Sequence, residues 1–191
     1  GRFITESLPG GSERGVAIGF DARRKSEVFA LDTARVFAAQ GIASYLLPSP
    51  LPTPVLASAI VEMGAVMGVM VTASHNPPAD NGYKVFLADG SQIVTPIDEQ
   101  IAARIEEIDI EHIALAADDH PLITRVSLDD ALAPYLRRVP LMRLVPSVGT
   151  GIKVVYTAMH GVGRDTLVDA FAAAGLDAPI VEPTQAEPDG S

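Results

Sequence analysis

The feature of the sequence that most constrains the fold is a short apolar run, residues 65–71, which gives way abruptly to the polar segment 72–84. The run follows Gly64 and predicts a buried β-strand, and it is much too short to span a bilayer. Pro77 and Pro78 then interrupt regular structure. The polar segment is therefore predicted to be a loop that emerges where a buried strand ends.

Strands and helices are predicted to alternate through the rest of this region. Ser26 is a residue type that caps helices, Gly41 is a typical helix stop, and Asp89-Gly90 favours a tight hairpin turn. In chain order, the sequence predicts strands at 16–20, 42–47 and 65–71, helices at 26–40, 53–63 and 96–108, and a hairpin at 83–94. Alternation with short connections predicts an α/β fold, in which a mixed, mostly parallel sheet is sandwiched by helices.

The alternation stops after residue 108 and restarts near residue 152. Residues 109–123 are acidic and irregular, a helix is predicted within 127–143, and Pro134 is expected to start or kink it. A short strand–helix–strand pattern follows and is too small for an independent core. We therefore predict three parts: an irregular N-terminal segment (1–15), a first α/β domain (16–145), and the truncated beginning of a second, similar α/β domain (146–191), with an interdomain linker at 146–151.

Composition narrows the classes of function. The chain has 191 residues with 48% apolar content and a net charge of −10 from 24 acidic and 14 basic side chains. Nucleic acid is not expected as a partner, because such binding depends on Lys and Arg that neutralise phosphates. The chain has no cysteine, which excludes disulfides and suits a cytoplasmic protein, and no apolar stretch predicts a membrane partner.

The polar loop offers a hydroxyl at Ser74, an imidazole at His75, an amide at Asn76 and, ten residues after the serine, the ammonium of Lys84. Adjacent residues on an extended chain point to opposite sides, so His75 is badly placed to be a general base for Ser74. A phosphorylated serine fits the set better, because charge-assisted donors stabilise a dianion. Arg23, at the end of another predicted strand, is expected at the same ligand-binding edge of the sheet.

The loop resembles the active-site loop of the α-D-phosphohexomutase family, which includes phosphoglucomutases and phosphomannomutases. The matching residues are Thr72-Ala73-Ser74-His75-Asn76-Pro77-Pro78 and Asn81-Gly82-Tyr83-Lys84. Three further parts of the chain support the resemblance: Gly19-Phe20-Asp21-Ala22-Arg23 with Ser26, Pro52-Thr53-Pro54, and His160-Gly161-Val162-Gly163 with Glu187-Pro188-Asp189-Gly190.

The resemblance implies an enzyme that interconverts hexose 1-phosphate and hexose 6-phosphate, with glucose or mannose as the sugar. Phospho-Ser74 would hand its phosphoryl group to the hexose phosphate substrate, and the resulting hexose 1,6-bisphosphate would return its other phosphate to the serine. Lys84 would transfer protons and Arg23 would lie near the phosphoserine, while His75 and Asn76 would shape the loop or bind substrate. Mg²⁺ would bridge the Ser74 phosphate to three aspartates and neutralise charge on the transferring group.

One departure from the family pattern is decisive for activity. The aspartates belong to an Asp-Gly-Asp-x-Asp-Arg loop that the sequence lacks, because Asp89-Gly90 and Asp189-Gly190 are each followed by serine. The family's later sugar-binding and phosphate-binding loops are also missing. The chain is thus expected to be an N-terminal portion whose partners are the missing C-terminal domains, and to have little or no mutase turnover alone.

Other interpretations stay open. A degenerate, non-catalytic module that binds sugar phosphate or a protein partner is one, and a serine hydrolase is another, although the Gly-x-Ser-x-Gly elbow is missing. Lys84 taken alone is typical of a solvated strand, and Arg23 of a local pair with Asp21. His160 is expected to be structural, and the isoleucines at 97, 101, 105 and 108 are expected to pack in the core.

Overall fold

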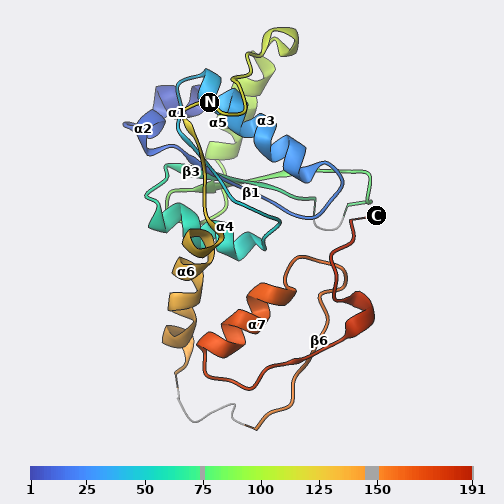
Figure 1. Ribbon diagram of the computed structural model, residues 1–191. Helices are drawn as coiled ribbons and strands as arrows, with labels where there is room; N and C mark the ends of the chain where they lie inside the picture. The colour runs from blue at the N-terminus through green and yellow to red at the C-terminus, as the bar shows by residue number, and fades with distance from the viewer. Residues whose placement is uncertain (74–75, 145–150, 191) are drawn as a thin grey trace.

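The computed structural model describes residues 1–73, 76–144 and 151–190, which form two α/β units (Figure 1). The larger unit has a five-stranded sheet in the order β4-β3-β1-β2-β5. Its strands are β1 (Val16–Phe20), β2 (Ser44–Leu46), β3 (Met67–Val71), β4 (Tyr83–Leu87) and β5 (Ile123–Arg125). All neighbouring pairs are parallel except β3 and β4. The predicted mixed, mostly parallel sheet is confirmed.

Helices cover both faces of this sheet (Figure 1). One face carries α1 (Arg2–Ser7), α2 (Gly11–Arg14), α3 (Ser26–Ala39) and α5 (Ile97–Glu106), and the other carries α4 (Thr53–Glu62) and α6 (Leu128–Arg138). Alternate residues of the central strand β1 pack against the helices on the two faces of the sheet: Val16 and Ile18 pack toward α3, and Ala17 packs toward α4. Every residue of β1 is buried, as expected for a strand with helices on both sides.

The most deeply buried apolar residues of α3 include Ala30 and Ala34, whose small side chains let the helix lie close to the sheet, and the partly buried Phe29 and Phe37 pack against the same core. Ser26 is not the cap of this helix. The N-cap is Lys25, whose backbone is left-handed with φ of 66°, and the Ser26 hydroxyl is directed to Asp21 instead.

The expectation of an irregular segment at residues 1–15 is wrong. These residues form α1 and α2, and Phe3 and Ile4 are buried in the core at 7% and 2% exposure. Arg104 of α5 binds the Glu6 carboxylate at 3.0 Å and lies over the Phe3 ring. The apolar residues of α1 are few, so the surrounding glycines and polar residues obscured the helical pattern.

Further details of the fold were not fully predicted from the sequence. Residues 109–123 connect two elements as predicted, but the three-residue strand β5 begins at their end, too short and polar to show a pattern. Residues 92–94 add only one bridge, between Gln92 and Phe86, rather than a hairpin strand. Ile97 and Ile101 pack against the core as expected, but Ile105 is 62% exposed. Pro134, which was expected to start or kink this helix, lies buried inside α6 and does not start it.

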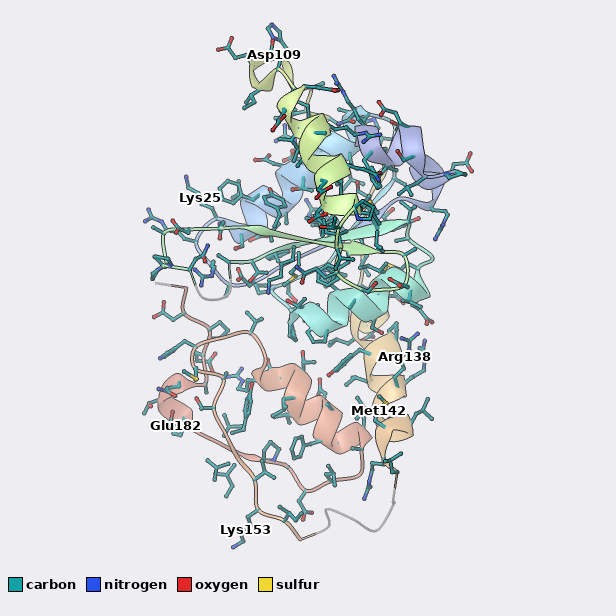
Figure 2. The ribbon with its side chains drawn as sticks, turned by 180° about the vertical axis from the view of Figure 1, so that it is seen from behind. Lys25, Asp109, Arg138, Met142, Lys153 and Glu182 are labelled. Atoms are coloured by element: carbon teal, nitrogen blue, oxygen red, sulfur yellow. The ribbon has the colours of Figure 1, made fainter. Side chains whose placement is uncertain are left out.

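The smaller unit has the predicted strand–helix–strand order. It contains β6 (Val155–Tyr156), α7 (Arg164–Ala173) and β7 (Ile180–Val181), and its two strands are parallel. Figure 2 shows Asp109 at the outer end of the larger unit and Lys153 at the outer end of the smaller one. The predicted linker falls mostly at 146–150, outside the described residues, so the proposed domain boundaries stay a prediction.

No helix among the residues that the structure describes is both long and apolar enough to cross a membrane.

Candidate active site

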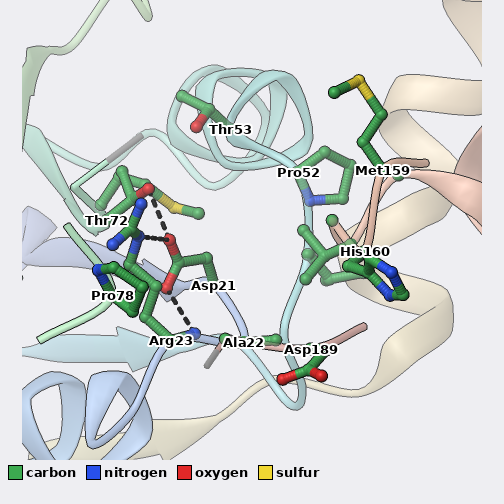
Figure 3. A pocket seen from close by; sticks show the side chains of 16 residues that line it. Asp21, Ala22, Arg23, Pro52, Thr53, Thr72, Pro78, Met159, His160 and Asp189 are labelled. Carbon is green, nitrogen blue, oxygen red and sulfur yellow. Dashed lines mark hydrogen bonds and ion pairs between the residues drawn. The ribbon is translucent and has the colours of Figure 1, made fainter. Parts of the chain in front are cut away.

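A cleft of about 480 Å³ separates the two units (Figure 3). The larger unit contributes residues 21–23, 51–53, Met70, Thr72 and Pro78, and the smaller unit contributes residues 159–163 and 189–190. Residues 21–23 follow β1 and Thr72 follows β3. These parallel strands end at the same edge of the sheet, where open α/β sheets bind ligands. Residues 21–23 and Thr72 therefore lie at the edge of the sheet where the sequence predicted the polar loops.

The Asp21 carboxylate is the centre of the polar network on the larger unit's side of the cleft. Its Oδ1 accepts hydrogen bonds from the Ser26 hydroxyl at 2.6 Å and from the backbone N–H of Arg23 at 3.0 Å. Its Oδ2 accepts a hydrogen bond from the Thr72 hydroxyl at 2.6 Å and lies 3.6 Å from Nε of Arg23. The carboxylate thus joins the ends of β1 and β3 to the start of α3.

Arg23 holds the loop that follows β3. Its Nη1 donates to the carbonyl oxygens of Pro77 at 3.0 Å and Asp80 at 3.3 Å, and its Nη2 donates to the carbonyl oxygen of Asn76 at 3.1 Å. The side chain is only 15% exposed. A planar guanidinium suits this arrangement because its N–H groups form a rigid fork. The structure therefore brings Arg23 to the predicted loop, as well as to Asp21.

Ser74 and His75 lie outside the described residues, so their predicted roles are not tested. The chain on either side of them is described. Thr72 donates its backbone N–H to Gly82 at 3.0 Å, and Asn76 donates to Ala73 at 3.1 Å. Asn76 itself is exposed, and the contact that places it is through its backbone carbonyl rather than its amide side chain.

Lys84 lies in β4, directly opposite Met70 in the antiparallel pair with β3. Side chains at such opposed positions point to the same face, with about 5 Å between their Cβ atoms. Met70 lines the cleft, so the stem of Lys84 starts on the cleft side of the sheet. Lys84 does not itself line the cleft, and its catalytic role stays a prediction.

The smaller unit presents His160 and Asp189 to the cleft (Figure 3). The His160 ring nitrogen Nδ1 lies 3.1 Å from the carbonyl oxygen of Glu187, and its backbone N–H donates to Gln185 at 3.0 Å. A carbonyl only accepts, so Nδ1 carries the proton in this contact. Met159 and His160 both have positive φ, 48° and 60°. These contacts agree with the expected structural role of His160, which shapes one wall of the cleft.

The sequence patterns suggested Asp21 only as a partner of Arg23 and gave Thr72 no role. Both lie in segments that the family resemblance had already matched. The signal that could have indicated Asp21 is its position directly after a predicted strand and five residues before Ser26, which the structure shows to be buried.

The described residues contain no group of three or more His, Cys, Asp or Glu side chains placed to hold a metal ion. The chemistry of the cleft agrees with that result, because the Asp21 oxygens are already occupied by hydroxyl, backbone and guanidinium donors. The residues present therefore do not fit a magnesium site on their own.

The fold and cleft define a class: an α/β/α sandwich with a polar site at the carboxyl ends of its parallel strands. The model of the phosphoglucomutase/phosphomannomutase family, α/β/α domain I, matches residues 1–112. The chain belongs to the phosphoglucomutase/phosphomannomutase family, as the sequence resemblance indicated.

Similar proteins share nearly the whole chain. It is 44% identical to a "Probable phosphomannomutase" of Haemophilus influenzae over 98% of its length, which is 39% of that relative. It is 35% identical to a human "Phosphopentomutase" and 37% identical to a human "Glucose 1,6-bisphosphate synthase", covering 32% of each. The chain therefore spans between about a third and two fifths of the length of these relatives.

Solved structures agree on the fold. A candidate phosphomannomutase from Thermus thermophilus matches 99% of the chain and 40% of its own, with a TM-score of 0.76 and 28% identity. Parafusin from Paramecium, in an open form, matches 98% of the chain and 39% of its own, with a TM-score of 0.67 at 16% identity, which supports the fold alone.

Proposed function

We propose that this chain carries the phosphoryl-transferring serine of a phosphosugar mutase, an isomerase that moves a phosphate between two hydroxyl groups of one sugar. The observation that carries the proposal is the contact between Arg23 and the segment around the predicted nucleophile. Arg23, at the end of β1, binds the carbonyl oxygens of Asn76, Pro77 and Asp80 at the edge of the cleft. Residues 76–80, which follow the predicted nucleophile, are thereby held beside a space of suitable size for a sugar phosphate, which supports the proposal.

In this proposal the phosphoryl group of phospho-Ser74 passes to a hydroxyl of the sugar phosphate, and the proton of that hydroxyl passes to Lys84. The serine oxygen leaves as an alkoxide, whose negative charge is balanced by the positive charge that Lys84 gains with the proton. The bisphosphate then reorients, its other phosphoryl group is transferred to the Ser74 oxygen, and the proton passes from Lys84 to the sugar oxygen that is released. Positioning and neutralisation of charge are the main sources of catalysis in such a transfer. Arg23, His75 and Asn76 are assigned to shaping and positioning the loop.

The proposed sugar is a hexose, glucose or mannose. The support is the loop motif, which has its nearest resemblance in the glucose and mannose branch, and the relative at 44% identity, which is named for mannose. Relatives named for pentose and for glucose 1,6-bisphosphate have 35% and 37% identity, so the sugar needs a direct measurement.

The proposal includes Mg²⁺ only through the family resemblance. Its expected ligands here would be the phosphate on Ser74, with the carboxylates coming from a loop that this sequence lacks. The ion would neutralise charge on the transferring phosphate. The described side chains do not form a metal site, so no step is assigned to them through the ion.

The experiment is intact-mass analysis with phosphopeptide mapping, on the chain as purified and after incubation with glucose 1,6-bisphosphate and Mg²⁺. One phosphoryl group on Ser74, absent in Ser74→Ala, is the expected result. Labelling of Ser74 by a fluorophosphonate would instead indicate a serine hydrolase, and neither modification would indicate a non-catalytic module. Mannose and ribose bisphosphates in parallel reactions identify the preferred sugar.

A separate assay tests turnover. The 191-residue chain with glucose 1-phosphate and Mg²⁺ is expected to form little or no glucose 6-phosphate, because the aspartate loop and the later sugar-binding loops are not in its sequence. Ordinary mutase turnover by this chain would refute that expectation.

A further inference from the structure

Asp21 lies in a position that is unusual for a carboxylate with only a structural role at the surface. It directly follows β1, its side chain is 15% exposed, and it lines the cleft. Its partners come from three separate segments: Thr72 at the end of β3, Ser26 at the start of α3, and Arg23 in the turn between β1 and α3. One carboxylate therefore sets the relative positions of the segments that form one wall of the cleft.

The bonds that Asp21 accepts are strong ones. Both hydroxyl donors stand at 2.6 Å, within the range of charge-assisted O–H···O⁻ bonds. The two carboxylate oxygens have different partners. Oδ1 receives Ser26 and the backbone of Arg23, while Oδ2 receives Thr72 and faces the Nε of Arg23. The second oxygen is thus the one that orients the guanidinium.

The orientation of Arg23 decides what its two terminal nitrogens reach. With Nε directed to Asp21, Nη1 and Nη2 are directed to the carbonyl oxygens of Pro77 and Asn76. The guanidinium is planar and rigid, so a rotation that breaks the contact at Nε also moves Nη1 and Nη2. The positions of the loop carbonyls therefore depend on Asp21, although no contact between Asp21 and these carbonyls is needed.

We propose that Asp21 is a positioning residue for the serine loop, which acts through Arg23 to hold the backbone of residues 76–80 in the geometry that phosphoryl transfer to and from Ser74 requires. The kinetic part of this inference rests on the proposed function. Asp21 is not assigned any contact with the sugar or with the transferring phosphate.

The sharpest variant is Asp21→Asn. The amide keeps an oxygen at the Oδ1 position for Ser26 and the Arg23 backbone, and the Thr72 hydroxyl can accept from the new NH₂ group. The contact with the cationic Nε of Arg23 is the one that is lost. The matched control is Asp89→Asn, since Asp89 also accepts from a backbone N–H and a hydroxyl two residues later, both on Ser91, and neither residue lines the cleft.

Backbone hydrogen exchange tests the positioning without any chemistry at Ser74. Asp21→Asn is expected to speed exchange of the Asn76 and Asp80 amides roughly five- to thirtyfold, because the loop is less firmly held once the ion pair that orients Arg23 is lost. Amides of β1 and β3, and all amides near the cleft in Asp89→Asn, should keep their rates. Unchanged exchange at 76–80 in Asp21→Asn would overturn the proposal.

A double-mutant cycle tests whether Asp21 acts through Arg23. The rate of phosphoryl gain by Ser74 from glucose 1,6-bisphosphate is measured in Asp21→Asn, Arg23→Met and the double variant. Each single change is expected to lower the rate by roughly ten- to a hundredfold, which is what a small misplacement costs, and the double variant should be no slower than Arg23→Met. Multiplicative losses would refute action through Arg23, because independent structural effects are additive in free energy.

The two proposals fail in different ways. If wild-type Ser74 takes no phosphate, the proposed function fails while hydrogen exchange still decides the role of Asp21. If wild-type Ser74 is phosphorylated and Asp21→Asn changes neither exchange nor rate, the function stands and the role of Asp21 is refuted.

Discussion

Gly190 lies so close to Ala22 that a Cβ on Gly190 would stand 2.5 Å from the carbonyl oxygen of Ala22 and 2.8 Å from Cα of Arg23. This is where the smaller unit touches the turn that carries the Asp21 and Arg23 network. Both Gly190 and Ala22 line the cleft, so their separation helps to set its width.

Gly190→Val is therefore expected to push the smaller unit away from the turn at 22–23. The chain has no cysteine, so Glu27→Cys and Asp169→Cys, both exposed, allow one spin label on each unit. Pulsed electron resonance should show a longer or broader distance distribution for Gly190→Val. Ala178→Val adds similar bulk at an exposed site of the same unit and should leave the distribution unchanged. Identical distributions for both variants would contradict the expectation.

Gly68 of β3 is predicted to be a packing requirement of the α4 layer. A Cβ at this position would stand 2.2 Å from Cδ1 of Ile60, which is fully buried. Gly68→Ala should lower the free energy of unfolding by about 1–3 kcal/mol, as overpacked cores do. Urea denaturation measures the change. Ile60→Val removes the clashing methyl group and costs about 0.5–1.5 kcal/mol alone, but it should restore part of the stability of Gly68→Ala. Additive losses in the double variant would show that the two side chains do not compete for space.

The N-terminal helix α1 is predicted to be part of the folded core. Ile4→Ala should lower the free energy of unfolding by about 2–5 kcal/mol, because Ile4 is 2% exposed and its removal leaves a cavity. Thr5→Ala, at the exposed neighbouring position, should change it by no more than about 0.5 kcal/mol. Thermal or urea unfolding of the two variants checks the difference, and equal stability of both would mean that α1 does not pack on the sheet.

The lowered pKa of Glu182 leads to a prediction about how stability depends on pH. The hydroxyl of Thr184 is the main cause that lowers the pKa of the Glu182 carboxyl, with further help from the backbone N–H groups of Thr184 and Gln185. A lowered pKa in the folded state contributes stability above the unfolded pKa, and this stability is lost as pH falls through the folded pKa. Thr184→Val should raise the pKa of Glu182 toward its ordinary value, which an NMR titration of the side-chain carboxyl carbon measures. No change on losing the hydroxyl would contradict the assigned cause.

The elements best predicted from the sequence were those with a long local pattern. The run that ends at Val71 became β3, and the helix of the predicted strand–helix–strand pattern became α7 (Arg164–Ala173). Elements that failed had too few residues to show a period, such as α1 and β5. Helix α1 depends on contacts such as that of Phe3 with Arg104, and β5 depends on pairing with β2. These partners are distant in the sequence, so they produce no local sequence pattern from which α1 or β5 could be predicted.

The candidate site divides in the same way. The sequence by itself determined the family, the loop motif around Ser74, and the placement of Arg23 at the carboxyl edge of the sheet, because motifs and strand ends are local properties of the chain. Only the tertiary structure decided that Asp21 joins Thr72, Ser26 and Arg23, and that residues 159–163 and 189–190 form the opposite wall of the cleft. Asp21 and Thr72 are 51 positions apart in the chain. Their contact follows from how the strands align in the sheet. The walls of the cleft follow from how the two units pack, and neither arrangement is encoded in a single segment.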